Sequence, residues 1–280
     1  MTPDPAPTAQ QLLAFYLEAG VDCALTETAV DRLADTDIAP AAVEAASPRP
    51  PRPIPAAAPV AAATPVSRGE TSVAPEAAIA SAREAARTAP SLEVLRALLE
   101  KFDGCALKST ATRMVFADGN PQARVMFVGE APGRDEDIEG LPFVGRSGKL
   151  LDRMIAAIGL DRSSAYIANV IPWRPPGNRT PTPQETQICL PFIQRQIELV
   201  NPDVLVTLGN PSTQTLLSTR EGIMRTRGKW FDYDTGTRVI KAIATFHPAY
   251  LLRSPSYKRM SWQDLRAIAK ALEQEKVSSS

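Results

Sequence analysis

The sequence predicts an α/β fold, a three-layer α/β/α domain with a central four-stranded parallel sheet. From Arg124 onward, short apolar runs alternate with segments whose apolar residues recur at helical spacing. This alternation is typical of a parallel sheet that helices cover on both faces. The apolar runs predict strands over residues 125–128, 166–170, 204–208 and 239–244.

Helix signals fall between these runs. Residues 91–102 and 147–160 place their leucines, isoleucines and methionine on one helical face. Thr182, Pro183 and Glu185 form the capping pattern that starts another helix, with a proline at its first position and a glutamate at its third.

The chain divides into three predicted parts. Residues 1–38 predict a small helical appendage, because Leu12, Phe15 and Tyr16 fall on one helical face after a capping threonine. Residues 39–90 contain no aromatic residue, and 29 of these 52 residues are alanine or proline, so we expect a disordered linker. Residues 91–280 form the predicted folded domain.

Composition excludes some classes of protein. The chain is 44% hydrophobic but has no apolar run long enough to cross a membrane. Its three cysteines are too few for a disulfide framework, which indicates a reducing cytoplasm. Residues 220–259 hold nine basic and three acidic side chains. Such an excess suits a phosphate backbone, although it is also common on a solvated face.

Polar residues follow each predicted strand. Gly129 and Glu130 follow the first strand, Asn169 ends the second, Gly209 and Asn210 follow the third, and the chain's one histidine, His247, follows the fourth. Ligands of open α/β sheets bind beyond the carboxyl ends of the strands. We therefore expect a site at this edge. A nucleotide-binding loop at Gly129 is disfavoured, because the phosphate-loop Lys-Ser/Thr pair and the spaced glycine fingerprint are both missing.

Taken together, several motifs closely resemble family 4 uracil-DNA glycosylases, in order and with fitting spacing, from about Leu99 to the last predicted helix. They are Gly129-Glu130-Ala131-Pro132-Gly133, Glu136-Asp137, Gly140-Leu141-Pro142-Phe143-Val144-Gly145, Asn169, Arg174-Pro175-Pro176-Gly177-Asn178-Arg179 and His247-Pro248-Ala249-Tyr250-Leu251-Leu252. The resemblance implies hydrolysis of the N-glycosidic bond of uracil in DNA, which leaves an abasic site and initiates base-excision repair.

The resemblance also assigns residues. It implies catalytic roles for Glu130, Asn169 and His247: Glu130 positions or deprotonates the water or stabilises the sugar cation, Asn169 reads the uracil edge, and His247 donates to uracil O2. Phe143 would stack on the flipped base, and Gly129 and Ala131 complete the base-binding set. The competing interpretations are a helix-capping glutamate, a turn asparagine and a core phenylalanine.

DNA contacts are implied in two places. Leu252 and Arg253, beyond the histidine, resemble a loop that wedges into the minor groove. Basic and polar residues in other loops are expected to meet phosphates, although each one alone would also suit a solvated surface. These are Arg174, Arg179, Ser212, Arg227 and Lys229.

The sequence departs from the family at the iron–sulfur cluster. Family 4 enzymes typically hold a 4Fe–4S cluster with four cysteines. Here Cys105 and Cys189 match two of those positions, but Phe102 and Trp173 occupy the other two. We therefore expect that no metal is bound and no cofactor is required, and that the two aromatic side chains fill the volume of the cluster.

The implied enzyme is a monofunctional glycosylase, because no lysine occupies a Schiff-base position in the family pattern. We expect a monomer in a bacterial-type cytoplasm, associated with the nucleoid when acting, with no membrane partner. One rival is a protein that binds uracil-DNA without turnover. Another is a repair scaffold whose residues 8–37 recruit a repair or replication protein.

Overall fold

The computed structural model of the protein describes residues 75–278. The predicted appendage of residues 1–38 and most of the predicted linker lie outside the described residues. Side chains are described up to residue 274.

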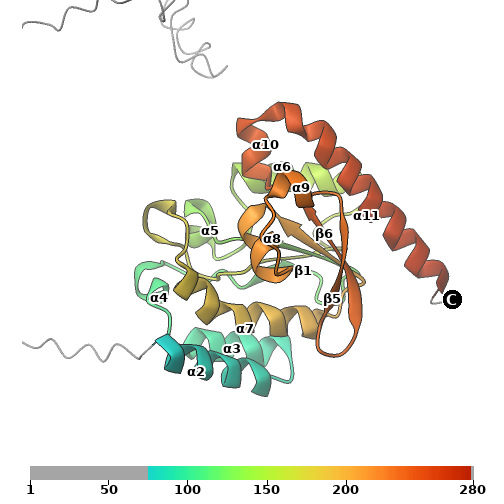
Figure 1. Cartoon of the computed structure of the whole chain (residues 1–280). Coiled ribbons are helices and arrows are strands. Elements are labelled where there is room, and N and C mark those ends of the chain that lie inside the picture. Colours follow the sequence, from blue (N-terminus) through green and yellow to red (C-terminus); the bar gives the residue numbers. More distant parts are fainter. Residues whose placement is uncertain (1–74, 279–280) are drawn as a thin grey trace, which may run out of the picture. The chain divides into compact units, whose positions relative to one another are not determined.

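The centre of the fold is a six-stranded mixed sheet, counted over the described residues, with the order β1-β3-β2-β4-β6-β5 (Figure 1). Its four inner strands are parallel to one another, as the sequence predicts: β3 (Tyr166–Asn169), β2 (Val125–Gly129), β4 (Val204–Leu208) and β6 (Val239–Thr245). All residues of β2, β3 and β4 are buried, which explains why these strands are mainly apolar.

The sequence does not predict the two edge strands. Both run antiparallel to their neighbours: β1 (Ala117–Gly119) pairs with β3, and β5 (Trp230–Asp234) pairs with β6 in a hairpin. β1 is short and polar, and β5 exposes alternate residues, so neither has the apolar run that marks a buried strand.

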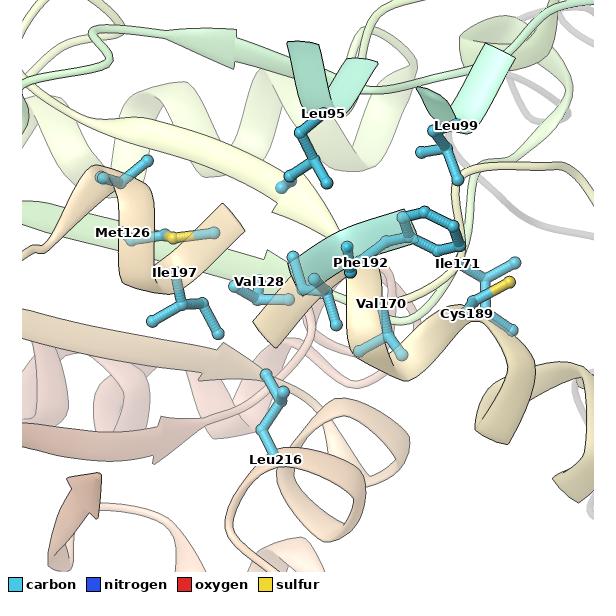
Figure 2. Packing of buried hydrophobic residues seen from close by; sticks show 14 of the residues in the cluster. Leu95, Leu99, Met126, Val128, Val170, Ile171, Cys189, Phe192, Ile197 and Leu216 are labelled. Atoms are coloured by element: carbon cyan, nitrogen blue, oxygen red, sulfur yellow. The ribbon is translucent and has the colours of Figure 1, made fainter. Parts of the chain in front are cut away.

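One face of the sheet packs against the layer that contains α7. This layer consists of α2 (Pro75–Thr88), α3 (Leu92–Lys101), α7 (Pro183–Val200) and α8 (Asn210–Leu216). In the core, Leu95 and Leu99 of α3, Phe192 and Ile197 of α7 and Met126 of β2 belong to one buried cluster (Figure 2). The predicted cap of α7 is confirmed: the Thr182 hydroxyl accepts from Glu185 N, and the Glu185 carboxylate accepts from Thr182 N.

The opposite face packs against α6 (Arg146–Ala156), α10 (Pro248–Arg253) and α11 (Lys258–Ser278), which lie together on the other side of the sheet in Figure 1. Shorter elements connect the layers. They are α4 (Leu107–Thr110), α5 (Arg134–Glu139), α9 (Ile223–Thr226) and the 3₁₀ turns η1 (Pro176–Asn178) and η2 (Pro255–Tyr257). None of the helices described is long and apolar enough to cross a membrane.

The prediction of a disordered linker is wrong over its last part. Residues 75–88 form the helix α2, which lies beside α3 and α7 (Figure 1). Its inner face carries Ala78, Ala82 and Ala86, all buried, and Arg195 of α7 donates to the carbonyl of Ala89 at 2.7 and 3.0 Å. Alanine side chains are small, so α2 can approach α7 closely. The folded domain therefore begins near residue 75 and not at residue 91.

We expect a protein that lacks residues 1–90 to be less stable than one that lacks residues 1–74. Removing residues 1–90 exposes the surface that Ala78, Ala82, Ala86 and Ala89 cover. At about 0.8 kcal/mol per buried methyl-sized group, the loss is about 3 kcal/mol, which lowers Tm by roughly 6–12 °C. Removing residues 1–74 keeps α2 and is the matched control. Equal thermal denaturation midpoints for the two truncations would contradict this assignment.

Candidate active site

A cavity of about 550 Å³ opens at the carboxyl edge of the parallel strands. Glu130, Phe143, Asn169 and His247, which come from four separate segments, all line it. The prediction that these residues converge is therefore confirmed. Further lining comes from Ala131, Pro132, Gly133, Ser147, Pro175, Asn178, Arg179, Gly209, Asn210, Ile223, Tyr250 and Arg253.

The end of β2 packs tightly against two of these side chains. Gly129, the last residue of β2, lies opposite Asn169, the last residue of β3, in the sheet. A Cβ atom on Gly129 would lie 2.4 Å from Asn169 Oδ1 and 2.7 Å from Phe143 Cζ. A glycine is therefore required here so that the amide and the ring can lie against the strand. Asn169 is buried, so its position is fixed by packing.

Phe143 adopts a left-handed backbone conformation, with φ of +55°. Such a conformation is costly for a residue with a side chain and persists only where the surroundings enforce it. Arg162 supplies that support: its guanidinium donates to the carbonyl oxygens of Phe143 and, at 3.1 Å, of Pro142. Asp118 and Asp152 hold the same guanidinium at 2.5 and 2.9 Å. The Phe143 ring is thus held with its centroid 5.4 Å from that of His247.

His247 sits between β6 and α10 as the N-cap of that helix. Its Nδ1 accepts a hydrogen bond from Ala249 N at 3.1 Å. Burial, assisted by the positive charge of Arg253, lowers the pKa of His247 to about 4. The ring is therefore neutral near pH 7 with Nδ1 as an acceptor, so its proton lies on Nε2. The imidazole can offer one hydrogen bond without carrying a charge.

Glu130 follows β2, and its Oε1 is buried with no hydrogen-bond partner among the described residues. Burial raises the pKa of this carboxyl group above its ordinary value of 4.5. The alternative capping role is excluded, because Glu136 occupies it: Glu136 accepts from Gly133 N at the start of α5 at 3.1 Å. The other oxygen of Glu136 accepts from Gly145 N at 3.0 Å, so this residue also ties α5 to the loop that carries Phe143. Glu130 is therefore left to face the cavity.

Most of the residues predicted to contact DNA lie at the surface. Arg179 and Arg253 line the cavity, and Leu252 is exposed on α10. Arg179 is paired with Glu185 at 2.6 Å, and the exposed Lys229 lies 3.4 Å from Glu221.

Arg174 lies five residues before Arg179 in the same loop, and its guanidinium donates to Asn178 Oδ1 at 2.7 Å. It is largely buried and lies 3.9 Å from Asp137.

Two of the predicted DNA contacts are wrong as direct contacts. Ser212 lies in the first turn of α8 and is fully buried, and its hydroxyl donates to Leu208 O at 3.0 Å. Arg227 points inward, where it forms an ion pair with the buried Asp264 and donates to Met260 O at 2.7 Å. Both side chains are satisfied by the fold, so they do not reach a phosphate from these positions.

Three residues near the site have no assigned role in the sequence prediction. Arg162 and Glu136 both act through loop backbones. Glu136 lies in one of the family motifs, whereas no local sequence pattern marks Arg162. Asn210 lines the cavity, and its Oδ1 is buried without a hydrogen-bond partner among the described residues. A signal for Asn210 exists, because it follows the strand-ending Gly209 at the same sheet edge as the other site residues.

Comparison with known proteins agrees with this geometry. The sequence profile of the uracil DNA glycosylase superfamily matches residues 116–266. The type-4 uracil-DNA glycosylase of Archaeoglobus fulgidus is 42% identical over 168 residues, which cover 59% of this chain and 84% of that protein. This chain belongs to the type-4 uracil-DNA glycosylases. Proteins of the same name from Thermotoga maritima (42% identity over 59% of this chain and 85% of that protein) and Saccharolobus solfataricus (37% over 67% and 89%) support the assignment.

The four positions of the type-4 cluster lie together in this chain but do not suit an iron–sulfur cluster. Phe102, Cys105, Trp173 and Cys189 are all buried in one hydrophobic cluster, and the two Sγ atoms are 3.9 Å apart. Phe102 also packs edge-on against Phe192, with ring centroids 5.1 Å apart. No group of three or more metal-binding side chains occurs in the part of the chain that the structure describes. Two thiols beside two aromatic rings cannot supply four ligands.

The support of Phe143 by Arg162 gives a testable prediction. Arg162→Met removes both donors to the loop. The left-handed conformation of Phe143, which costs about 1–3 kcal/mol, then loses the contacts that stabilise it. We expect inhibition by free uracil to weaken about tenfold, with KM rising more than kcat falls. Arg124→Met, which breaks a partly buried ion pair with Asp203 at the start of β4, away from the cavity, is the control and should keep wild-type uracil inhibition. Unchanged uracil inhibition in a folded Arg162→Met variant would show that Arg162 has no such role.

Proposed function

We propose that this chain hydrolyses the N-glycosidic bond of uracil in DNA as a monofunctional glycosylase, leaving an abasic site for base-excision repair. The observation that carries the proposal is the shared cavity of Glu130, Phe143, Asn169 and His247 at the carboxyl edge of the sheet. Membership of the type-4 family gives the substrate class. No lysine lines this cavity among the described residues, which fits hydrolysis without a Schiff-base intermediate.

Base recognition is assigned to three parts of the site. Uracil flipped out of the DNA stacks on the Phe143 ring, while the Asn169 amide accepts from N3–H and donates to O4. Cytosine presents the opposite pattern at these two atoms, so it would leave the buried amide unpaired. Gly129 and Ala131 form the wall beside the base, where a larger residue at Gly129 would displace both Asn169 and Phe143.

Catalysis is assigned to His247 and Glu130. When the bond between C1′ and N1 breaks, negative charge develops on uracil O2, where the Nε2–H of neutral His247 donates a hydrogen bond. Burial strengthens the interaction between this donor and the developing charge, because little water is present to screen it. The Glu130 carboxylate holds the water that attacks C1′ and accepts its proton.

DNA binding is assigned to the rim of the cavity. Leu252 is the exposed apolar residue that would fill the space vacated by the base, and Arg253, Arg174, Arg179 and Lys229 would meet phosphates. Arg179 and Arg174 would exchange their present carboxylate and amide partners for phosphate oxygens on binding.

We also propose that the 4Fe–4S cluster of the family is lost here and that the enzyme needs no cofactor. The packing of Phe102 and Trp173 beside Cys105 and Cys189 supports this proposal. A hydrogen bond from Cys189 lowers the pKa of Cys105, while the same contact and burial raise the pKa of Cys189.

We further propose that the protein acts as a monomer in a bacterial-type cytoplasm, associated with the nucleoid when acting. The free thiols of Cys105 and Cys189 fit a reducing compartment. Residues 8–37 remain the proposed segment for recruiting a repair or replication protein. A recruitment test in cells requires truncation after residue 74, because truncation after residue 90 also removes α2.

Single-turnover excision from a uracil-containing oligonucleotide tests the function. Wild type should release uracil and leave an alkali-labile site on a denaturing gel. We expect His247→Ala to lower the rate about 10²–10³-fold and Glu130→Gln to lower it about 10²-fold or more, with uracil-DNA binding largely kept. Tight binding by wild type without release of uracil would instead establish the rival binding protein.

Replacing the two cysteines tests the loss of the cluster. We expect protein purified without oxygen to contain iron far below one atom per chain and to lack the visible absorbance of an iron–sulfur cluster. Cys105→Ala with Cys189→Ala should keep the excision rate, at the expense of some stability from two small cavities. Stoichiometric iron in wild type that disappears in this double variant would overturn the proposal.

A further inference from the structure

Two buried side-chain oxygens lack a hydrogen-bond partner among the described residues, and both line the active-site cavity. They are Glu130 Oε1 and Asn210 Oδ1. A buried acceptor without a donor is unfavourable, so such atoms are rare in folded proteins and usually face a ligand or water. Both residues line the same cavity, so each free oxygen is available to a donor bound there.

The sheet places these two residues side by side. Val128 of β2 lies opposite Thr207 of β4 in the parallel ladder. Glu130 comes two residues after Val128, and Asn210 comes three residues after Thr207. The two side chains therefore leave the ends of adjacent strands.

The backbone at Asn210 is held rigidly. Gly209, with φ of +90°, makes the turn, and a Cβ atom there would lie 2.9 Å from His247 Cβ. The Gly209 carbonyl accepts from the Thr213 hydroxyl at 2.7 Å, and that hydroxyl lies 2.8 Å from the Thr207 hydroxyl inside the core. The backbone that carries Asn210, just beyond the end of β4, is thus held close to His247, which suits Asn210 to a role in the reaction.

We propose that Asn210 is a catalytic residue that holds the attacking water together with Glu130. This inference rests on the proposed glycosylase function and adds a second residue to its nucleophile site. Both free oxygens are acceptors, and a water molecule has two O–H donors. A water that donates to Glu130 Oε1 and Asn210 Oδ1 turns its lone pairs away from both, toward the sugar.

The step balances in this arrangement. The bond between C1′ and N1 breaks, and its electron pair leaves with uracil, whose O2 accepts from His247 Nε2–H. A lone pair of the water forms the new bond to C1′, and one water proton moves to the Glu130 carboxylate. Asn210 takes no proton, because its amide oxygen is a weak base, and so it only orients the water.

Asn210→Leu tests the role, because it removes the acceptor and keeps the side chain's approximate size. We expect the single-turnover excision rate to fall roughly 10- to 100-fold. Affinity for an oligonucleotide with 2′-fluoro-2′-deoxyuridine, whose glycosidic bond resists cleavage, should stay within about twofold, as should inhibition by free uracil. Asn210→Asp keeps an oxygen acceptor and should recover most of the rate at alkaline pH. Gln194→Leu, an exposed amide on α7 that does not line the cavity, is the control.

Competition with methanol gives a readout that loss of stability would not move. Methanol has one O–H donor and cannot serve both acceptors, so wild type should form little methyl glycoside. Asn210→Leu should form a larger share, because water loses its second anchor. A wild-type rate in Asn210→Leu, or a rate loss matched by lost DNA affinity with unchanged methanol share, would overturn the inference. Failure of wild type to release uracil would instead overturn the proposed function.

Discussion

The register of four parallel strands is the constraint on which the site depends. Because β3, β2, β4 and β6 run in the same direction, their last residues meet at one edge, and four short turns can present side chains to one space. The contact of Gly129 with Asn169 and Phe143 shows how close this approach is. A shift of one residue in β2 would turn Gly129 away and place a side chain where the amide and the ring now lie.

Burial shifts the pKa values of Glu130 and His247 in opposite directions. It disfavours charge on both, so it raises the pKa of Glu130 and lowers that of His247. For His247 the result is a neutral donor at physiological pH. For Glu130 it is a carboxylate that accepts a proton more readily than an exposed one. The proposed mechanism needs this combination, because its leaving group carries negative charge and its water must lose a proton.

The sequence predicts the local features of this fold and misses those that depend on distant partners. Apolar runs mark the inner strands, and the Thr182 cap is encoded within four residues. The sequence analysis missed α2 because the buried residues of this helix are alanines, which give little hydrophobic pattern. Their role becomes visible only when α7 lies beside them. Arg227 resembled a phosphate contact because its partner Asp264 lies 37 residues away. The predicted strand ends mark Glu130, Asn169 and His247, and the family resemblance adds Phe143 and the roles of the residues. Arg162, which supports Phe143 from outside any motif, was missed.

The aromatic residues at the degenerate cluster positions also bear on the cavity. Trp173 is buried next to the segment that contains Arg174, Pro175, Asn178 and Arg179, and the last three of these line the site. A metal cluster would anchor such a loop through thiolate bonds. Here the burial of Trp173, together with Phe102 against Phe192, anchors it through apolar packing. Under the proposed loss of the cluster, this packing would hold the loop beside the cavity without a metal.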